Sequence, residues 1–372
     1  MPTKPSTPIN RLILIGNGFD LAHGLKTSYG DFIFWYFQKS WNLAKDAFVP
    51  SQKKRFINLF KDDLISISVN PFVQQDKPLD LEINNHHTIK EFVKVEVEPF
   101  KPRAIKCKIE SDLFISLVNN FLTKNWVDIE NHYYEELTKI ITPTISYNNP
   151  KGKVDFTKLT KLNKDFDSIK KVLEVYLSTL KSPSRIDPLE NIIYELPLYW
   201  NTFSDKELIL KNLLLLNFNY TDTPKKYKRL EADIIYIHGK LKDEKNPIIF
   251  GYGDERDESY TILEKANNPE VFSHIKSFDY LKTNNYSRLL AFLETPFEVY
   301  IMGHSCGLSD RTLLSSIFEH DNCRLIKIFY YNDIDRYRET TYEISRHFTS
   351  KAEMRRKVIN FSDCTPMPQL GT

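Results

Sequence analysis

The 372-residue sequence is poor in cysteine, and none of its four cysteines belongs to a C-x-x-C pair. Structural zinc sites and disulfide frameworks both need suitably spaced cysteines, so the sequence indicates neither of them. Reduced thiols are typical of the cytoplasm, which is the location we expect for this protein. The four residues are Cys107, Cys306, Cys323 and Cys364.

Long hydrophobic runs are also absent. The apolar run at residues 12–15 is too short for a signal peptide, and the run at residues 213–216 is too short to cross a bilayer. The sequence therefore predicts no association with a membrane.

Charge of one sign is not in excess, because 51 lysines and arginines face 49 acidic residues and leave a net charge of +2. Nucleic-acid-binding domains usually carry a strongly basic field, so nucleic acid is not an expected partner. The C-terminal part is locally more basic, and a solvated helix face explains this better than a polynucleotide patch does. The basic residues there are Arg336, Arg338, Arg346, Lys351, Arg355, Arg356 and Lys357.

Five short apolar runs have the composition of buried parallel strands. The first, residues 11–15 (RLILI), ends directly at Gly16-Asn17-Gly18. The other four follow residue 205, with helical or loop segments between them, which predicts one parallel sheet with crossover helices. They are residues 213–217 (LLLLN), 233–238 (DIIYIH), 299–303 (VYIMG) and 324–331 (RLIKIFYY).

Between residues 41 and 204 glycine almost disappears and helical patterns dominate. Residues 92–98, followed by Pro99, alternate instead and predict a surface hairpin strand. We therefore expect an α/β domain built from residues 1–40 and 205–372, interrupted by a mainly helical insert at residues 41–204.

One helix of this insert shows a clear apolar face. Its apolar residues are spaced alternately three and four apart, which places them on one side of a helix that Pro183 ends. An ordinary intramolecular packing face explains this pattern better than a coiled-coil seam. The residues are Leu159, Leu162, Phe166, Ile169, Leu173, Tyr176 and Leu180.

Polar and glycine-bearing segments directly follow four of the predicted strands. In an open parallel sheet these segments gather at the carboxyl edge, where ligands bind. The sequence therefore predicts a ligand site made from several distant segments. They are residues 16–20, 217–222, 238–239 and 303–305.

The turn after the first strand suits a dinucleotide. Gly16 and Gly18 let the backbone approach a pyrophosphate, and a helix behind them offers free N–H groups; a tight strand-to-helix turn is the alternative. The full dinucleotide fingerprint requires a third glycine where this chain has Leu21, and no acid-tipped second strand follows. This argues against an ordinary dehydrogenase.

Three histidines and an asparagine are candidates for the chemistry. His238 ends a strand, and its unperturbed pKa of about 6.5 makes it the best general-base candidate, although a satisfied half-buried histidine is the structural alternative. His23 and His304 lie near the glycine turns and compete for this role. Asn219 lies in a turn-rich segment, where asparagine is often structural.

The remaining candidates have a structural alternative too. Asp20 is either a helix cap or a ligand contact. Gly303 and Ser305 suit a ribose or phosphate contact, or they begin a helix. Asp128 and Glu130 can form a pair of acids, but no histidine or cysteine cluster with metal-ligand spacing joins them, so a metal site is not expected and a metal-dependent nuclease is not favoured. A solvated helix face explains these two acids better.

Residues 13–25 (ILIGNGFDLAHGL), followed by Thr27, Ser28, Tyr29 and Phe32, resemble the opening of the AbiH family of bacterial abortive-infection proteins. Four later segments resemble further motifs of that family in the same order. They are residues 126–130 (WVDIE), 217–221 (NFNYT), 237–239 (IHG) and 303–305 (GHS).

That family is similar to the sirtuin-like NAD-binding fold, a Rossmann-like doubly wound sheet that several phage-defence effectors use. The resemblance implies an anti-phage protein that hydrolyses NAD at its nicotinamide–ribose bond, with NAD as substrate rather than as a true cofactor. In sirtuin-like enzymes an asparagine and the histidine of an H-G motif serve the reaction, and these fall on Asn219 and His238. The residues expected to contact NAD are Gly16, Asn17, Gly18, Asp20, Gly303 and Ser305.

The chain departs from the sirtuin pattern at two points. Thr221 stands where an aspartate is expected, and the zinc-holding cysteine pairs of sirtuin deacetylases are missing, so hydrolysis is favoured over deacetylation. A non-catalytic NAD or ADP-ribose sensing module and a nuclease or RNA-directed toxin stay open as alternatives. A phage-derived trigger and assembly into a homo-oligomer also stay open.

Overall fold

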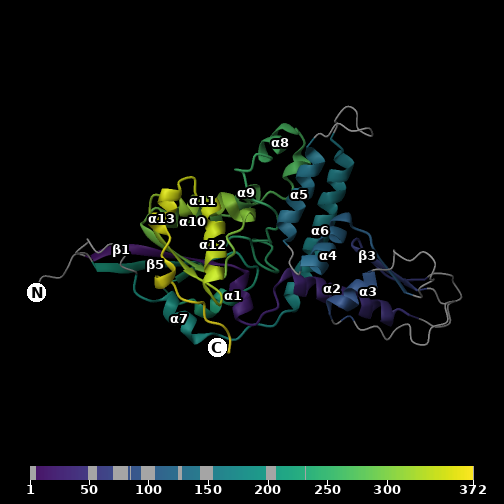
Figure 1. Cartoon of the computed structure of the whole chain (residues 1–372), viewed down its shortest axis with the longest axis horizontal. Helices are drawn as coiled ribbons and strands as arrows, with labels where there is room; N and C mark the ends of the chain where they lie inside the picture. The colour runs from purple at the N-terminus through teal and green to yellow at the C-terminus, as the bar shows by residue number, and fades with distance from the viewer. Residues whose placement is uncertain are drawn as a thin grey trace, which may run out of the picture. The chain divides into compact units, whose positions relative to one another are not determined.

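The computed structural model describes residues 6–48, 57–69, 83, 85–93, 105–124, 128–142, 154–197, 207–230 and 232–371. The chain forms two compact units (Figure 1). Unit 1 consists of Met1–Thr27, Leu180–Thr261 and His274–Thr372, and unit 2 of Ser28–Thr179 and Ile262–Ser273. Unit 2 thus begins before residue 41, and the segment from Leu180 belongs to unit 1, whereas the sequence placed the helical insert at residues 41–204.

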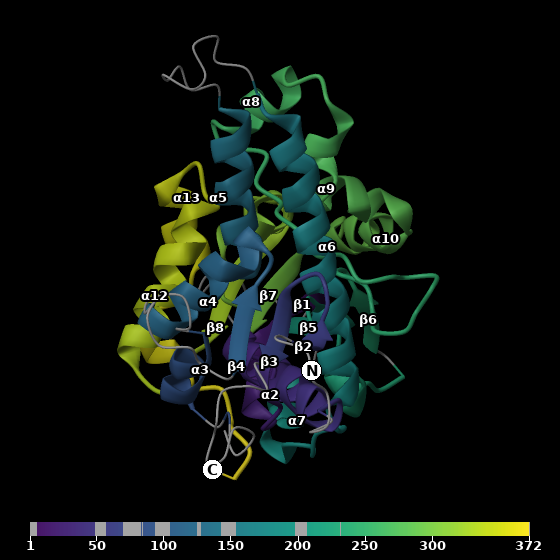
Figure 2. The same cartoon turned by 90° about the vertical axis from the view of Figure 1, so that its right-hand side faces the viewer.

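Unit 1 is built on a five-stranded sheet in which all neighbouring strands are parallel. Its order is β6-β5-β1-β7-β8 (Figure 2). Each strand contains most of one of the five predicted apolar runs, so the prediction of an α/β fold with a parallel sheet is confirmed. The strands are β1 (Ser6–Ile15), β5 (Glu207–Asn217), β6 (Ala232–Tyr236), β7 (Phe297–Met302) and β8 (Cys323–Phe329).

The five strands end at a common edge. Ile15 pairs with Asn217 on one side of β1 and with Met302 on the other. On the outer strands, Tyr236 pairs with Asn217, and Phe329 pairs with Met302, so the last residues of all five strands lie side by side. The chain first adds strands on one side of β1 and then crosses to the other side at β7, so the strand order reverses there. In open α/β sheets this reversal point is where ligands bind.

Both faces of the sheet are covered. Leu12, Ile13, Leu14 and Ile15 are fully buried, and consecutive side chains of a strand point to opposite faces. A strand buried on both faces is typical of parallel sheets that lie between helices. The helices of unit 1 are α1 (Asn17–Ala22), α7 (Asp187–Ile193), η2 (Thr223–Tyr227), α9 (Lys276–Asp279), η4 (Tyr280–Lys282), α10 (Asn285–Leu293), η5 (Leu308–Asp310), α11 (Arg311–Phe318), α12 (Ile334–Arg346), α13 (Lys351–Lys357) and η6 (Phe361–Asp363).

Unit 2 combines helices with a small antiparallel sheet of order β2-β3-β4, which the sequence analysis did not predict. Its members are α2 (Tyr29–Asp46), β2 (Ile57–Lys61), β3 (Ile65–Val69), α3 (His86–Val93), β4 (Ile105–Ile109), α4 (Asp112–Lys124), α5 (Ile129–Ile141), α6 (Phe156–Thr179) and η3 (Pro269–Phe272), while α8 (Tyr260–Lys265) crosses the boundary between the units.

The strand predicted at residues 92–98 is wrong at its beginning. Phe92 and Val93 belong to α3, where Phe92 is buried, and residues 94–98 lie outside the described residues. An alternating pattern this short does not distinguish a strand from a helix. The Phe92 ring packs against Phe37 and Trp41, and this packing favours the helix.

The apolar face predicted for residues 159–180 is confirmed along α6. The first six of its seven residues lie in the helix and are buried, and Leu180 directly follows the helix end. This face packs within unit 2, against α2, α4 and α5, as an intramolecular face should. Ser28 caps α2 by accepting a hydrogen bond from the Asp31 N–H.

The basic C-terminal run lies on helices whose arginines pair with nearby acids. Arg336 contacts Glu339, and Arg356 contacts Glu353, each three residues away on the same helix. Six of the seven basic residues of the run are exposed, which confirms the interpretation as a solvated helix face for them, whereas Lys357 is buried.

A buried ion pair joins β1 to β7 beneath α7. Arg11 and Glu298 are both fully buried, and the Arg11 Nε donates to Glu298 Oε1 at 2.6 Å. Arg11 Nη1 also donates to the carbonyl oxygens of Ile193 and Glu195, each at 2.9 Å, which ties the end of α7 to the sheet. The guanidinium lies over the ring of Tyr300, 4.3 Å from its centroid.

We expect Arg11→Met to lower the free energy of unfolding of unit 1 by about 3–5 kcal/mol, because it leaves a buried carboxylate without its partner. Urea unfolding measures this change. Arg336→Met removes an arginine from an exposed pair and should cost less than about 1 kcal/mol. The double variant Arg11→Met/Glu298→Leu should recover most of the loss. Equal unfolding curves for the two single variants would show that the buried pair does not hold the sheet.

Candidate functional site at the carboxyl edge

The glycines of the carboxyl edge pack against one another. The Gly16 N–H donates to Met302 O at 3.2 Å, and the Gly18 N–H donates to Gly303 O at 2.8 Å. A Cβ on Gly303 would lie 2.1 Å from the backbone nitrogen of Phe19, and Gly303 has a φ of +71°. The glycines are therefore needed for a close backbone contact between the turns after β1 and β7.

This contact changes the expected role of the first turn. The amides of Gly16 and Gly18 already donate to the last residue of β7 and to the residue after it, and α1 behind them is only six residues long. The turn therefore matches the structural alternative of a tight strand-to-helix connection, and its glycine amides do not point free N–H groups at a ligand. Asn17, between the two glycines, is exposed at this edge.

The segment after β5 is fixed to the same turn. Asn219 Nδ2 donates to Gly16 O at 2.9 Å, and the Asn219 N–H donates to Asn217 Oδ1 at 3.1 Å. The Thr221 hydroxyl donates to Asp20 Oδ2 at 2.6 Å. The structure thus brings the predicted residues Asn219, Asp20 and Gly16 together.

Asp20, in α1, is almost completely buried, with an exposed fraction of 1%. Burial raises its pKa to about 6, and hydrogen bonds from the hydroxyls of Thr221 and Thr223 offset part of this effect. It is not the N-cap of α1, which is Gly16. The capping alternative for Asp20 is therefore wrong, and its carboxyl group interacts with the segment after β5 instead.

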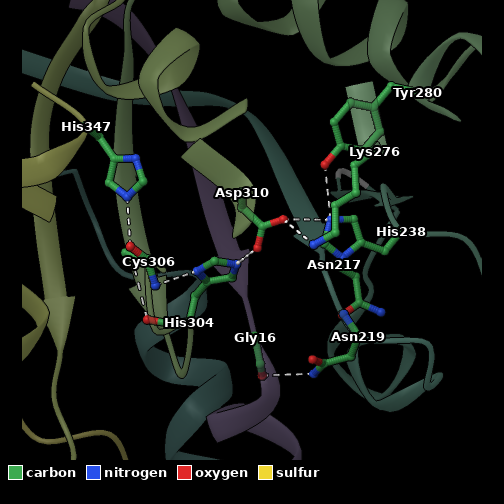
Figure 3. Close-up of polar contacts among 10 residues, drawn as sticks. All are labelled: Gly16, Asn217, Asn219, His238, Lys276, Tyr280, His304, Cys306, Asp310 and His347. Atoms are coloured by element: carbon green, nitrogen blue, oxygen red, sulfur yellow. Dashed lines mark hydrogen bonds and ion pairs between the residues drawn. The ribbon is translucent and has the colours of Figure 1, made fainter. Parts of the chain in front are cut away.

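His238 belongs to a buried cluster centred on Asp310 (Figure 3). Its Nε2 lies 3.1 Å from Asp310 Oδ1 and 3.2 Å from the Tyr280 hydroxyl. Lys276 Nζ donates to the same Asp310 Oδ1 at 2.9 Å. We refer to His238, Lys276, His304 and Asp310 as the Asp310 cluster.

His304 completes the cluster on the other carboxylate oxygen. Its Nε2 lies 3.6 Å from Asp310 Oδ2, and its Nδ1 accepts a hydrogen bond from the Cys306 N–H at 2.9 Å. Cys306 O in turn lies 2.7 Å from Nε2 of His347 (Figure 3). The Phe218 ring packs edge-on against the rings of both His238 and His304. The cluster therefore connects the segments after β5, β6 and β7.

Burial controls the electrostatics of this cluster. It lowers the pKa of His238, and it lowers the pKa of His304 to about 4. Burial alone would raise the pKa of Asp310, but Lys276 and the two histidines hold it well below its usual value. At neutral pH the cluster therefore contains one carboxylate, one ammonium group and two neutral imidazoles.

The other predicted residues differ in burial and in the contacts that they make. Ser305 is exposed after Gly303. His23 is buried, and its ring nitrogens lie 2.6 Å from Phe19 O and from the Tyr227 hydroxyl, so both are used structurally. In unit 2, Asp128 caps α5 and Glu130 is buried, so the solvated face expected for them is wrong.

The sequence analysis did not assign Lys276 and Asp310 of the cluster, or the neighbouring Tyr280, to the site. Lys276 and Tyr280 lie in α9 and η4, between strands and outside any glycine-bearing motif, so no sequence signal marks them. Asp310 lies in η5, in a segment where the sequence indicates only the beginning of a helix. Its place seven residues after the Gly303 turn was the one available signal.

Among the described residues no group of three or more histidines, cysteines, aspartates or glutamates is arranged to hold a metal ion. None of the helices within the described ranges is both long enough and apolar enough to cross a bilayer.

The fold and this site define an α/β protein with a polar, titratable cluster at the carboxyl edge of a parallel sheet. The family model described as bacteriophage abortive infection AbiH matches residues 12–332. The chain belongs to the AbiH family, as its motifs predicted. Searches of curated proteins and of solved structures find no match.

We expect Gly303→Ala to destabilise unit 1 by on the order of 3–5 kcal/mol, because its methyl group would overlap the Phe19 backbone. Gly371→Ala is a matched control, since Gly371 has a φ of +84° but nothing within 4 Å of an added Cβ. Strain alone should cost the control about 1–2 kcal/mol at most. Thermal unfolding of both variants measures the difference, and equal losses would refute the close-contact explanation.

Proposed function

We propose that this AbiH-family protein binds NAD at the carboxyl edge of its sheet and hydrolyses the nicotinamide–ribose bond. One observation carries this proposal: polar segments from four strands meet beside the point where the strand order reverses. Family membership supplies the biological setting, which is abortive infection by bacteriophage.

The sheet supports a Rossmann-like interpretation of the fold. Numbered along unit 1, its strands have the order 3-2-1-4-5, which agrees with the first five strands of dinucleotide-binding doubly wound sheets. The sirtuin-like subtype, with a glycine turn, an asparagine and an H-G histidine after successive strands, is part of our proposal.

In the proposed complex the exposed Asn17 and Ser305 contact ribose or phosphate groups. Gly16, Gly18 and Gly303 have no side chains, so their closely packed backbone leaves the edge where the dinucleotide lies free of bulky groups. Asp20 and Asn219 Nδ2 hold the segment after β5 to the turn after β1.

Nicotinamide leaves as a neutral molecule from a positively charged ring, so the ribose passes through an oxocarbenium-like state. Water then adds to the ribose carbon, and its proton must be accepted. Asn219 orients a ribose hydroxyl and the water, and His238 accepts the proton. Asp310 stabilises the resulting imidazolium, because its carboxylate lies 3.1 Å from His238 Nε2. The Tyr280 hydroxyl, 3.2 Å from the same nitrogen, provides a path for the proton.

A second candidate is a module that binds NAD or ADP-ribose without turnover. It is favoured by the burial of His238, whose exposed fraction is only 4% and whose ring also hydrogen-bonds the Phe218 backbone. A histidine held on both sides by protein groups serves structure well, and it must gain access to substrate to serve catalysis.

We expect the purified protein to release nicotinamide from NAD, and His238→Ala to lower the rate at least about 100-fold because the proton acceptor is lost. Chromatography of the products measures this rate, and calorimetry measures NAD binding separately. The assay should include phage lysate, since an abortive-infection effector acts only when infection is sensed.

The matched control is His87→Ala, because His87 is an exposed histidine of α3 in unit 2 and should leave turnover unchanged. NAD binding without nicotinamide release under all conditions would replace hydrolysis by the sensing function. Failure of both NAD and ADP-ribose to bind would overturn both candidates.

A further inference from the structure

We propose that Asp310 is the positioning residue of this site: its two carboxylate oxygens hold His238 and His304 on opposite sides, while Lys276 supplies the one positive charge that keeps both imidazoles neutral. The charge balance follows from the cluster alone, and its use in proton transfer rests on the proposed function.

The first argument is the cost of buried charge. The side chain of Lys276 is fully buried, and that of Asp310 is 9% exposed. Unpaired buried charges cost several kcal/mol each, so such a cluster is stable only when its charges sum to zero. One carboxylate and one ammonium group, 2.9 Å apart, already meet this condition. A proton on either histidine would leave a net charge of +1.

The second argument is the orientation of His304. Because its Nδ1 accepts the Cys306 N–H, the neutral ring must carry its proton on Nε2, which faces Asp310 Oδ2. Cys306 can hold this position because it adopts a φ of +55° directly after the Gly303 turn. The ring of His304 is thus fixed from both ends.

The groups that face the cluster from neighbouring elements do not change its net charge. They are the Tyr280 hydroxyl from η4, the buried Cys306 thiol, and His347 at the end of α12. Burial raises the pKa of Cys306 and lowers that of His347, so the thiol and imidazole are both neutral near pH 7. Glu343 of α12 also acts on the thiol.

The arrangement has a consequence for proton transfer. When His238 accepts a proton at Nε2, the new charge lies beside Asp310 Oδ1, and the other oxygen of the same carboxylate faces His304. Asp310 therefore stabilises the charged form of either histidine. Replacing Lys276 by an uncharged residue should favour the charged form of a histidine, because a proton on its ring then makes the cluster neutral again.

The test is nuclear magnetic resonance of protein labelled with nitrogen-15 in its histidine rings, recorded from pH 5 to pH 8. In the unmodified protein we expect His238 and His304 to be neutral at pH 7, with the proton of His304 on Nε2. In Lys276→Met the pKa of at least one of them should rise by about 1–3, because its neighbour is now an unbalanced carboxylate. The double variant Lys276→Met/Asp310→Asn should return both rings to the neutral form.

The matched control is Lys357→Met, because Lys357 is also buried but donates to the carbonyl oxygens of Phe318 and His320. It should leave the resonances of His238 and His304 unchanged. Histidines that stay neutral in folded Lys276→Met would overturn the proposal, as would charged ones in the double variant. If Lys276→Met does not fold, a double variant that folds with neutral rings supports the proposal, and one that does not fold overturns it. None of these readouts depends on NAD, so they separate this proposal from the proposed function.

Discussion

The contact between the turns after β1 and β7 is the constraint on which the site depends. Gly303 can approach Gly18 so closely because neither residue has a side chain, and its positive φ turns the chain toward His304. The same approach leaves Gly16 O available to Asn219. Three segments that are far apart in the sequence are thereby fixed at one edge before any titratable group is considered.

The Asp310 cluster is built on this framework, and it combines two requirements that oppose each other. Burial excludes water, which strengthens the interactions among its charges but makes every unbalanced charge expensive. Lys276 resolves this conflict by pairing with Asp310, so that His238 can be both deeply buried and neutral. A neutral histidine beside a carboxylate is suited to accept a proton, and a fixed neutral histidine is equally suited to hold a fold together. The protein's chemistry thus depends on whether substrate reaches this imidazole.

The sequence predicted the parallel sheet because strands such as β1 are buried on both faces and therefore read as continuous apolar runs. It also predicted that residues 16–20, 217–222, 238–239 and 303–305 would meet, since this follows from strand direction alone. It could not predict Lys276 or Tyr280, because crossover segments are placed by packing and carry no periodic signal. The role of the glycines was equally hidden, since a glycine that admits another backbone and a glycine that admits a phosphate have the same sequence signature.

The central claim is that a dinucleotide lies at the carboxyl edge where β1 and β7 meet. A crystal structure of the protein with ADP-ribose tests this most directly, because ADP-ribose lacks the bond that the protein is proposed to cleave. The account predicts ADP-ribose against Asn17 and Ser305, with its terminal ribose directed toward Asn219 and the Asp310 cluster. ADP-ribose bound elsewhere on the protein, or not bound at millimolar concentration, would contradict it.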